Sequence, residues 1–304
     1  MTVAHLETAQ ADTATPVPAL LSAAYRRLDA VCEALSVRVT DPGRSATRQP
    51  LSRTTRPALS RATRAPRPAA HTIGLMDGQE SVEAFVEAEA ARIQDRHDHS
   101  APRHVAASRA LHDYAWSIGL LMSGVWYLER RVPHVAPSDI RVDLTTGMYE
   151  ITPGTDLVCL PDDAATDLPD TRTVAHQEAL RAELRAAVAD HMGPVLDAIG
   201  PYARRGSRAL WGLVGDDLVS GLWYLGRMRG DEASGVRAAS AVLPSAHAPF
   251  PGGADFRSLR TSDGREHPTR TRMGCCLYYT IRPAEACSTC PRTCDTERLR
   301  RLEG

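Results

Sequence analysis

The sequence predicts a mainly α-helical protein with a small β-hairpin or sheet insertion, two duplicated helical halves and a C-terminal cysteine-rich segment. Three observations support this fold class. Apolar residues recur at helical spacing over much of the chain, two stretches about a hundred residues apart resemble each other, and five of the seven cysteines follow Gly274. We therefore expect three parts: a flexible N-terminus (1–16), a helical domain (17–245), and a connector with the cysteine segment (246–304).

The first half of the helical domain contains two predicted helices and an unusual loop. Apolar side chains lie at helical spacing within 17–37, with Cys32 on the apolar stripe as a small buried residue, and again within 80–96. Between them, 40–71 is rich in Arg, Pro, Ser and Thr, a composition that predicts a disordered loop. An alternative interpretation of this loop is a cationic arm that binds an acidic protein or an anionic ligand.

An internal duplication follows, over 102–131 and 201–229. The segments PRHVAASRAL and PYARRGSRAL share five of ten residues, and SGVWYLERR and SGLWYLGRM share six of nine. Each copy is predicted to be helical, so we expect two related halves around a pseudo-two-fold axis. Their Trp-Tyr pairs are expected in the core, with a ligand groove between the halves as the alternative. The pairs are Trp126-Tyr127 and Trp223-Tyr224.

The remaining elements lie between and after the two copies. Alternating polar and apolar residues in 138–161 predict a β-hairpin and a third short strand, with Cys159 packed in the strand. A long helix is expected within 171–199, ending or kinking near Gly193-Pro194. A short helix should run from about Gly230 to Leu243, followed by a Pro/Gly-rich connector.

Composition excludes several functional classes. All 36 basic residues are arginine, so the chain has no lysine for a Schiff base or for a phosphate-binding P-loop. The net charge of −1 predicts no general nucleic-acid binding. The sequence contains no run of 18 apolar residues and no secretory signal pattern. We expect a cytoplasmic protein without a transmembrane segment, loosely associated at most with the inner face of the membrane.

The cysteine segment has the pattern C-C-x10-C-x2-C-x3-C, formed by Cys275, Cys276, Cys287, Cys290 and Cys294. In a reducing compartment such a cluster indicates metal binding or redox chemistry rather than disulfides. A C-x2-C turn brings two thiolates to one metal or cluster. The adjacent pair can join them only if the backbone bends, for which Gly274 offers freedom. This pattern favours a binuclear iron–sulfur cluster over zinc, and a dithiol redox switch is the third alternative.

The stretch CCLYYTIRPAEACSTC resembles the C-terminal signature of the FhuF-like ferric-siderophore reductases. The segments at 77–78, 103–108 and 208–218 are similar to that family as well. The resemblance implies a 2Fe-2S cluster bound by Cys275, Cys276, Cys287 and Cys290, and leaves Cys294 as an additional thiol. It also implies iron uptake by one-electron reduction of a ferric siderophore, a hydroxamate or similar chelate, which releases Fe(II). No nucleotide-binding loop occurs, so electrons should come from an external donor such as a ferredoxin or a flavin reductase.

The other candidate residues have ordinary alternatives. Arg272 and Arg282 flank the cysteine pair and are candidates for contacting an anionic chelate, although a surface role would also explain them. Asp216-Asp217 should lie on a solvent-exposed helix face or form an ion pair between helices. His97, Asp98, His99 and His104 are expected in a solvated loop. The alternative function is a non-catalytic iron–sulfur or zinc-binding protein with a regulatory or interaction role.

Overall fold

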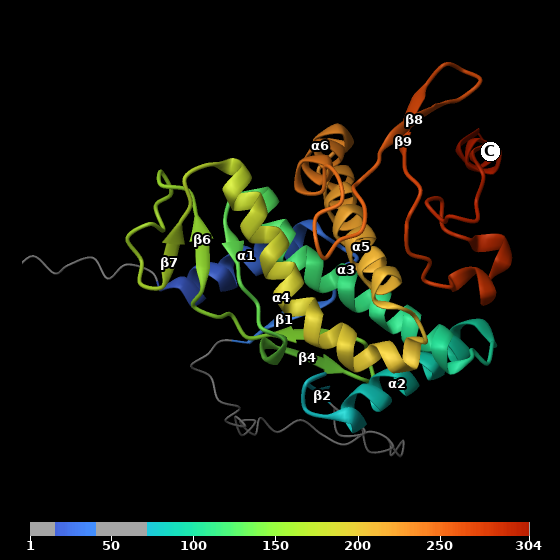
Figure 1. Cartoon of the computed structure of the whole chain (residues 1–304), viewed down its shortest axis with the longest axis horizontal. Coiled ribbons are helices and arrows are strands. Elements are labelled where there is room, and N and C mark those ends of the chain that lie inside the picture. Colours follow the sequence, from blue (N-terminus) through green and yellow to red (C-terminus); the bar gives the residue numbers. More distant parts are fainter. Residues whose placement is uncertain (1–15, 41–71, 304) are drawn as a thin grey trace, which may run out of the picture.

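The computed structural model describes residues 16–40 and 72–303, and within them it is mainly helical, as predicted (Figure 1). Seven α-helices occur in these ranges: α1 Val17–Val31, α2 Gln79–His97, α3 Arg103–Glu129, α4 Gln177–Ala203, α5 Ser207–Met228, α6 Glu232–Val242 and α7 Asp295–Glu303. The predicted flexible N-terminus and the Arg/Pro-rich loop fall almost entirely on 1–15 and 41–71, outside the described residues.

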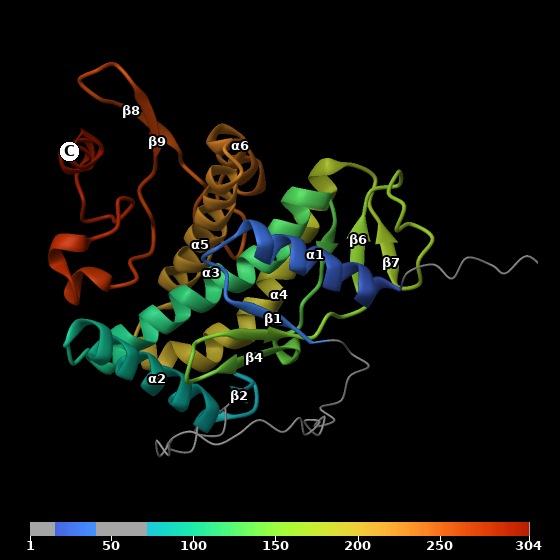
Figure 2. The same cartoon turned by 180° about the vertical axis from the view of Figure 1, so that it is seen from behind.

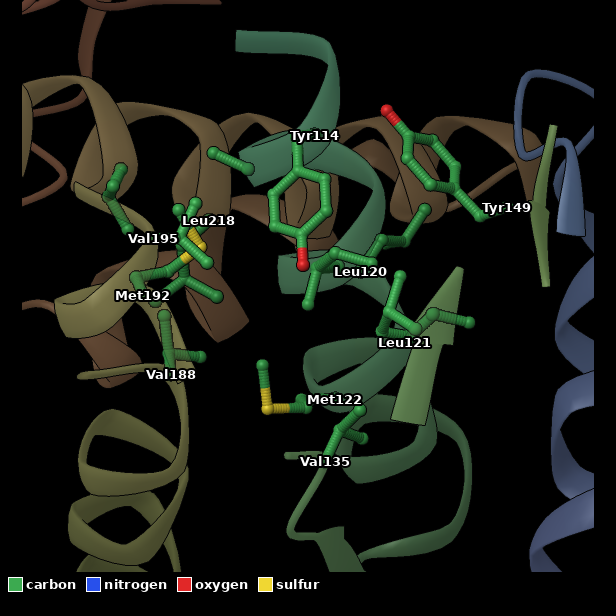
Figure 3. Packing of buried hydrophobic residues seen from close by; sticks show 14 of the residues in the cluster. Tyr114, Leu120, Leu121, Met122, Val135, Tyr149, Val188, Met192, Val195 and Leu218 are labelled. Carbon is green, nitrogen blue, oxygen red and sulfur yellow. The ribbon is translucent and has the colours of Figure 1, made fainter. Parts of the chain in front are cut away.

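The core is built around α3, which is buried on most of its surface and packs against α5, α4, α2 and α1. Figure 3 shows side chains of α3, α4 and α5 meeting there, among them Met122, Met192 and Leu218. Small residues permit close approach of the helices. A Cβ atom added at Gly226 of α5 would lie only 2.6 Å from the Cα atom of Gly235 in α6. Such contacts fix α5 firmly between α3 and α6.

The first copy of the sequence repeat forms α3, whereas the second begins in the last turn of α4 and then forms α5. Helices α3 and α5 lie side by side (Figures 1 and 2). Their Trp-Tyr pairs differ in environment, because Trp126 is buried whereas Trp223 and Tyr224 are half-buried. We expected all four aromatic residues in the core, but only Trp126 is fully buried. The pseudo-two-fold axis and the three-part division of the chain stay predictions.

The β structure forms small sheets beside the helices. The predicted hairpin is β4 Ile140–Asp143 and β5 Tyr149–Ile151, in a sheet of order β1-β5-β4-β2 with β1 Val37–Val39 and β2 Thr72–Ile73. The third strand belongs to another sheet, of order β3-β6-β7. Its strands are β3 Val132–Pro133, β6 Leu157–Cys159 and β7 Thr171–Thr173. Cys159 is buried in β6, as expected.

Two other regions differ in detail from the sequence analysis. Of the end or kink expected near Gly193-Pro194, the end is wrong, because helix α4 continues to Ala203 with the flanking Met192 and Val195 buried in the core. Packing of this face outweighs the hydrogen bond that a proline loses. The Pro/Gly-rich connector contains regular structure that was not predicted. It contains the hairpin of β8 Arg257–Arg260 and β9 Glu266–Thr269, whose turn includes Gly264 at a φ of 84°.

No helix in the described ranges is both long and apolar enough to cross a membrane.

Candidate metal centre

The cysteine segment follows β9 and lies at the opposite end of the molecule from β6 and β7 (Figures 1 and 2). It contains two short 3-10 helices, η2 Tyr278–Thr280 and η3 Pro283–Glu285, before it reaches α7. Cys275, Cys276, Cys287 and Cys290 all line one narrow cavity, which we call the cysteine cavity. Cys294 is exposed and lines a different cavity.

The adjacent pair reaches this cavity because the backbone turns sharply beside it. Leu277, directly after the pair, has a left-handed conformation with a φ of 64°. Gly274, directly before it, has a different role from the one expected. A Cβ atom there would lie 2.7 Å from both the N and Cα atoms of Leu213 in α5, so the glycine permits close approach rather than an unusual turn.

Buried charged residues clamp the segment to α5. Arg270 Nη2 lies 2.5 Å from Asp216 Oδ1, and the Gly274 amide donates to Asp216 Oδ2 at 2.6 Å. The next residue, Asp217, accepts from Arg272 Nη2 at 2.5 Å and lies 2.7 Å from His112 Nδ1 of α3. Of the two alternatives expected for Asp216-Asp217, the solvent-exposed face is therefore wrong, and the ion pairs with arginine join α5 to the C-terminal segment rather than to another helix. Both carboxylates are buried because the C-terminal segment crosses this part of α5.

The C-x2-C turn is held in place by another buried arginine, which comes from α7. The buried Arg298 donates its Nε to the Ser288 carbonyl at 2.6 Å and its Nη2 to the Cys290 carbonyl at 3.0 Å. The Arg272 amide donates to the Thr289 carbonyl at 2.9 Å from the other side. Three of the turn's carbonyls are thus satisfied by two arginines, which fixes the orientation of Cys287 and Cys290.

The cysteine cavity combines buried thiols with two nearby guanidinium groups. Burial raises the pKa of the Cys287 thiol to about 11, although Arg272 opposes this effect. Arg109 of α3 interacts electrostatically with Cys276 and forms an ion pair with Asp113 at 3.0 Å. Ligation by these thiols requires deprotonation, so the bound group and the two guanidinium groups must offset the thiolate charge.

A larger cavity lies on the other side of the C-x2-C turn. It has a volume of about 580 Å³ and is lined by residues of α2, α3 and α5, the segment after α1, the β4–β5 hairpin, Arg272, Ser288 and Thr289. We call it the arginine cavity, after Arg92, Arg96, Arg227 and Arg272 in its lining. Cys287 and Cys290 therefore line one cavity while the two residues between them line the other. A single turn of chain separates the two spaces.

The two arginine candidates differ in their surroundings. Arg272 is buried rather than on the surface and lines both cavities. Arg282 is exposed, donates to Glu285 Oε1 at 2.9 Å, and lines neither cavity. His97 packs against Tyr278, with ring centroids 5.8 Å apart. In the described part of the chain, no three His, Cys, Asp or Glu side chains are already gathered tightly enough for a metal ion.

The site thus defines a class: a helical protein with an all-cysteine centre in a clamped C-terminal segment. Four thiols around one cavity fit a cysteine-ligated cluster, provided that their side chains draw closer around it. Residues 272–292 match the model of the FhuF 2Fe-2S C-terminal domain, and this range ends before Cys294. The match supports an FhuF-like iron–sulfur protein with a 2Fe-2S cluster as its cofactor. No curated protein matches the chain.

Sequence reasoning missed the residues that hold the segment in place, namely Arg109, Arg270 and Arg298. They are scattered over the chain and resemble any surface arginine in sequence. Asp216-Asp217 did carry a signal, because two acidic residues interrupt an otherwise apolar and small-residue helix.

Proposed function

We propose that this protein is a cytoplasmic ferric-siderophore reductase that reduces chelated Fe(III) to Fe(II) by one electron. The observation that carries the proposal is the C-x2-C turn, which has cysteines on one cavity and Ser288 and Thr289 on the other. The match at 272–292 supports the same chemistry. A ligand in the arginine cavity would be separated from the cysteine cavity by one turn of backbone.

Iron release follows from the chemistry of the chelate. Hard anionic oxygens hold Fe(III) far more tightly than Fe(II), and each tenfold preference lowers the reduction potential of the iron by about 59 mV. A 2Fe-2S cluster, when bound, supplies single electrons at a potential that its protein surroundings tune. One electron from an external donor then reduces one ferric ion, and the weakened chelate releases Fe(II) and takes up protons from solvent.

The chain's own residues would hold the cluster, offset its negative charge and keep the cysteine segment in position. Cys275, Cys276, Cys287 and Cys290 would hold the cluster, while Arg109 and Arg272 offset the thiolate charge. Asp216 and Asp217 keep the segment against α5. We further propose a ferredoxin or flavin reductase as the donor, since the sequence contains no nucleotide-binding loop.

The test mixes anaerobically reduced protein with a ferric trihydroxamate and a colorimetric Fe(II) trap. We expect the protein to be reoxidised and about one trapped Fe(II) to form per reduced cluster. A reduced protein that keeps its electron in the presence of hydroxamate and catecholate chelates would contradict the proposal. That result would favour a non-catalytic regulatory protein instead.

A further inference from the structure

The arginine cavity has the size and position of a small-molecule site. Its volume of about 580 Å³ lies within the usual range for such sites, roughly 300 to 1,000 Å³. It opens between α2, α3 and α5, and the C-x2-C turn forms part of its wall. Arg272 lines both this cavity and the cysteine cavity, so a ligand here lies beside the metal centre.

The lining has more positive than negative charge. Its two carboxylates are already paired: Glu89 with Arg92 at 3.0 Å, and Asp113 with Arg109 at 3.0 Å. Arg272 is likewise paired with Asp217 at 2.5 Å. Across residues 16–40 and 72–303, neither Arg96 nor Arg227 has a carboxylate partner for its guanidinium group. Two cations at the exposed rim are therefore available to an anionic ligand.

Aromatic rings form another part of the wall. Trp116 of α3 and Tyr224 of α5 meet edge to face with centroids 5.5 Å apart, and both line the cavity. The Arg227 guanidinium lies over the ring of the neighbouring Trp223, 5.2 Å from its centroid. Flat rings beside guanidinium groups suit ligands with planar, delocalised anionic groups.

We propose that the arginine cavity is the chelate site and that it selects ferric chelates with net negative charge. This inference rests on the proposed function, because it assigns a location and a substrate class to that reaction. The surplus guanidinium groups of Arg96 and Arg227 provide the charge selection. The aromatic wall contacts the organic part of the chelate.

Three probes that differ in one terminal group test the charge preference. The gallium(III) complexes of desferrioxamine B, its N-acetyl derivative and its N-succinyl derivative carry one positive charge, no charge and one negative charge. Gallium(III) is not reduced, so equilibrium dialysis against the cluster-loaded full chain, followed by gallium analysis, measures binding alone. We expect the succinyl complex to bind about tenfold more tightly than the amine complex, with a smaller difference at high salt.

Matched variants assign the preference to residues. Arg96→Gln and Arg227→Gln should each weaken binding of the succinyl complex about fivefold and leave the amine complex nearly unchanged. Arg229→Gln is the control, since this exposed arginine follows α5 but does not line the arginine cavity. Equal binding of the three complexes, no binding of any of them, or Arg96 and Arg227 variants that behave like Arg229→Gln would overturn the inference.

The ferric forms of the same complexes separate this inference from the proposed function. If the gallium complexes bind in the expected order but no ferric complex is reduced, the site stands and the reductase proposal fails. If ferric complexes are reduced without any charge order or variant effect, the reductase proposal stands and this site assignment fails.

Discussion

Arg109 illustrates how single charged residues determine the properties of the metal centre. It comes from α3, far from the cysteines in sequence, yet its guanidinium group interacts electrostatically with Cys276 and lies over the Tyr278 ring, 5.3 Å from its centroid. A positive charge beside the ligands favours the reduced state of a cluster, because reduction adds negative charge. The reduction potential therefore depends on residues outside the cysteine motif.

Replacing Arg109 with Gln should lower the reduction potential by some tens of millivolts, because one nearby positive charge is lost. An anaerobic spectroelectrochemical titration measures this shift, with iron content checked in parallel. Arg103→Gln is the control, since Arg103 begins the same helix but stacks on Tyr202 instead. An Arg109 variant with the potential of the wild type would contradict this account of the centre.

Cys294→Ser should retain full iron and sulfide content, because Cys294 is exposed and lines a different cavity from the other four thiols. Cys287→Ser should lose most of both, since Cys287 lines the cysteine cavity. Metal and sulfide analysis of the two anaerobically purified variants makes the comparison. Loss of iron in both would show that the fifth thiol is a ligand.

At the scale of elements, the central contact is the one between α5 and the cysteine segment. Two buried aspartates of α5 bind three groups of the segment that follows β9. Asp216 binds Arg270 and the Gly274 amide, while Asp217 binds Arg272. These partners follow β9 directly, and α7 supports the same segment through Arg298; neither β9 nor α7 was predicted. Their short sequences are mostly polar and lack a run of apolar residues at regular spacing, so only tertiary contacts reveal them.

Gly274→Ala should destabilise the protein by roughly 1–3 kcal/mol and reduce cluster content, because the new methyl group would overlap the backbone of Leu213. Urea unfolding and iron analysis measure the two effects. Gly193→Ala in α4 is the control. It has open space at the same position and should be neutral or slightly stabilising. Equal behaviour of the two variants would argue against close packing of the segment on α5.

For the whole molecule, periodic and repeated sequence was sufficient to predict the helical fold. The amphipathic stretches became α1 and α2, and the duplication became the central pair α3 and α5. The cysteine motif likewise indicated the four thiols that line one cavity. The alternative of a ligand groove at the Trp-Tyr pairs pointed to one wall of the arginine cavity, which Trp223 and Tyr224 line. The rest of the lining could not be predicted, because it comes from α2, the segment after α1, the β4–β5 hairpin and the C-terminal turn, which only the fold brings together. As an arginine, Arg272 would be expected on the surface from sequence alone, but it is buried in the fold.

The folded core also predicts acid sensitivity through His191 of α4. Its Nδ1 donates to the Val135 carbonyl at 2.7 Å, so its Nε2 is free to accept from the Tyr114 hydroxyl at 2.8 Å. Burial lowers the pKa of His191 from 6.5 to about 4, which outweighs the opposing hydrogen bond to Val135. The unfolded chain therefore binds the proton more readily, and stability is complete above the unfolded pKa and falls as pH decreases toward 4.

This loss should reach about 3 kcal/mol, and chemical denaturation at a series of pH values measures it. His191→Gln removes the titrating group and should flatten the dependence over the same pH range. Parallel curves for the variant and the wild type would contradict the role of His191.

The most direct test of the central claim is the composition of the anaerobically purified protein. Visible absorption, iron and sulfide analysis, and EPR of the reduced form should together give about two iron and two sulfide per chain, with a paramagnetic signal on reduction. A colourless protein with one zinc and no sulfide would contradict the account of the metal centre and the reductase proposal that depends on it.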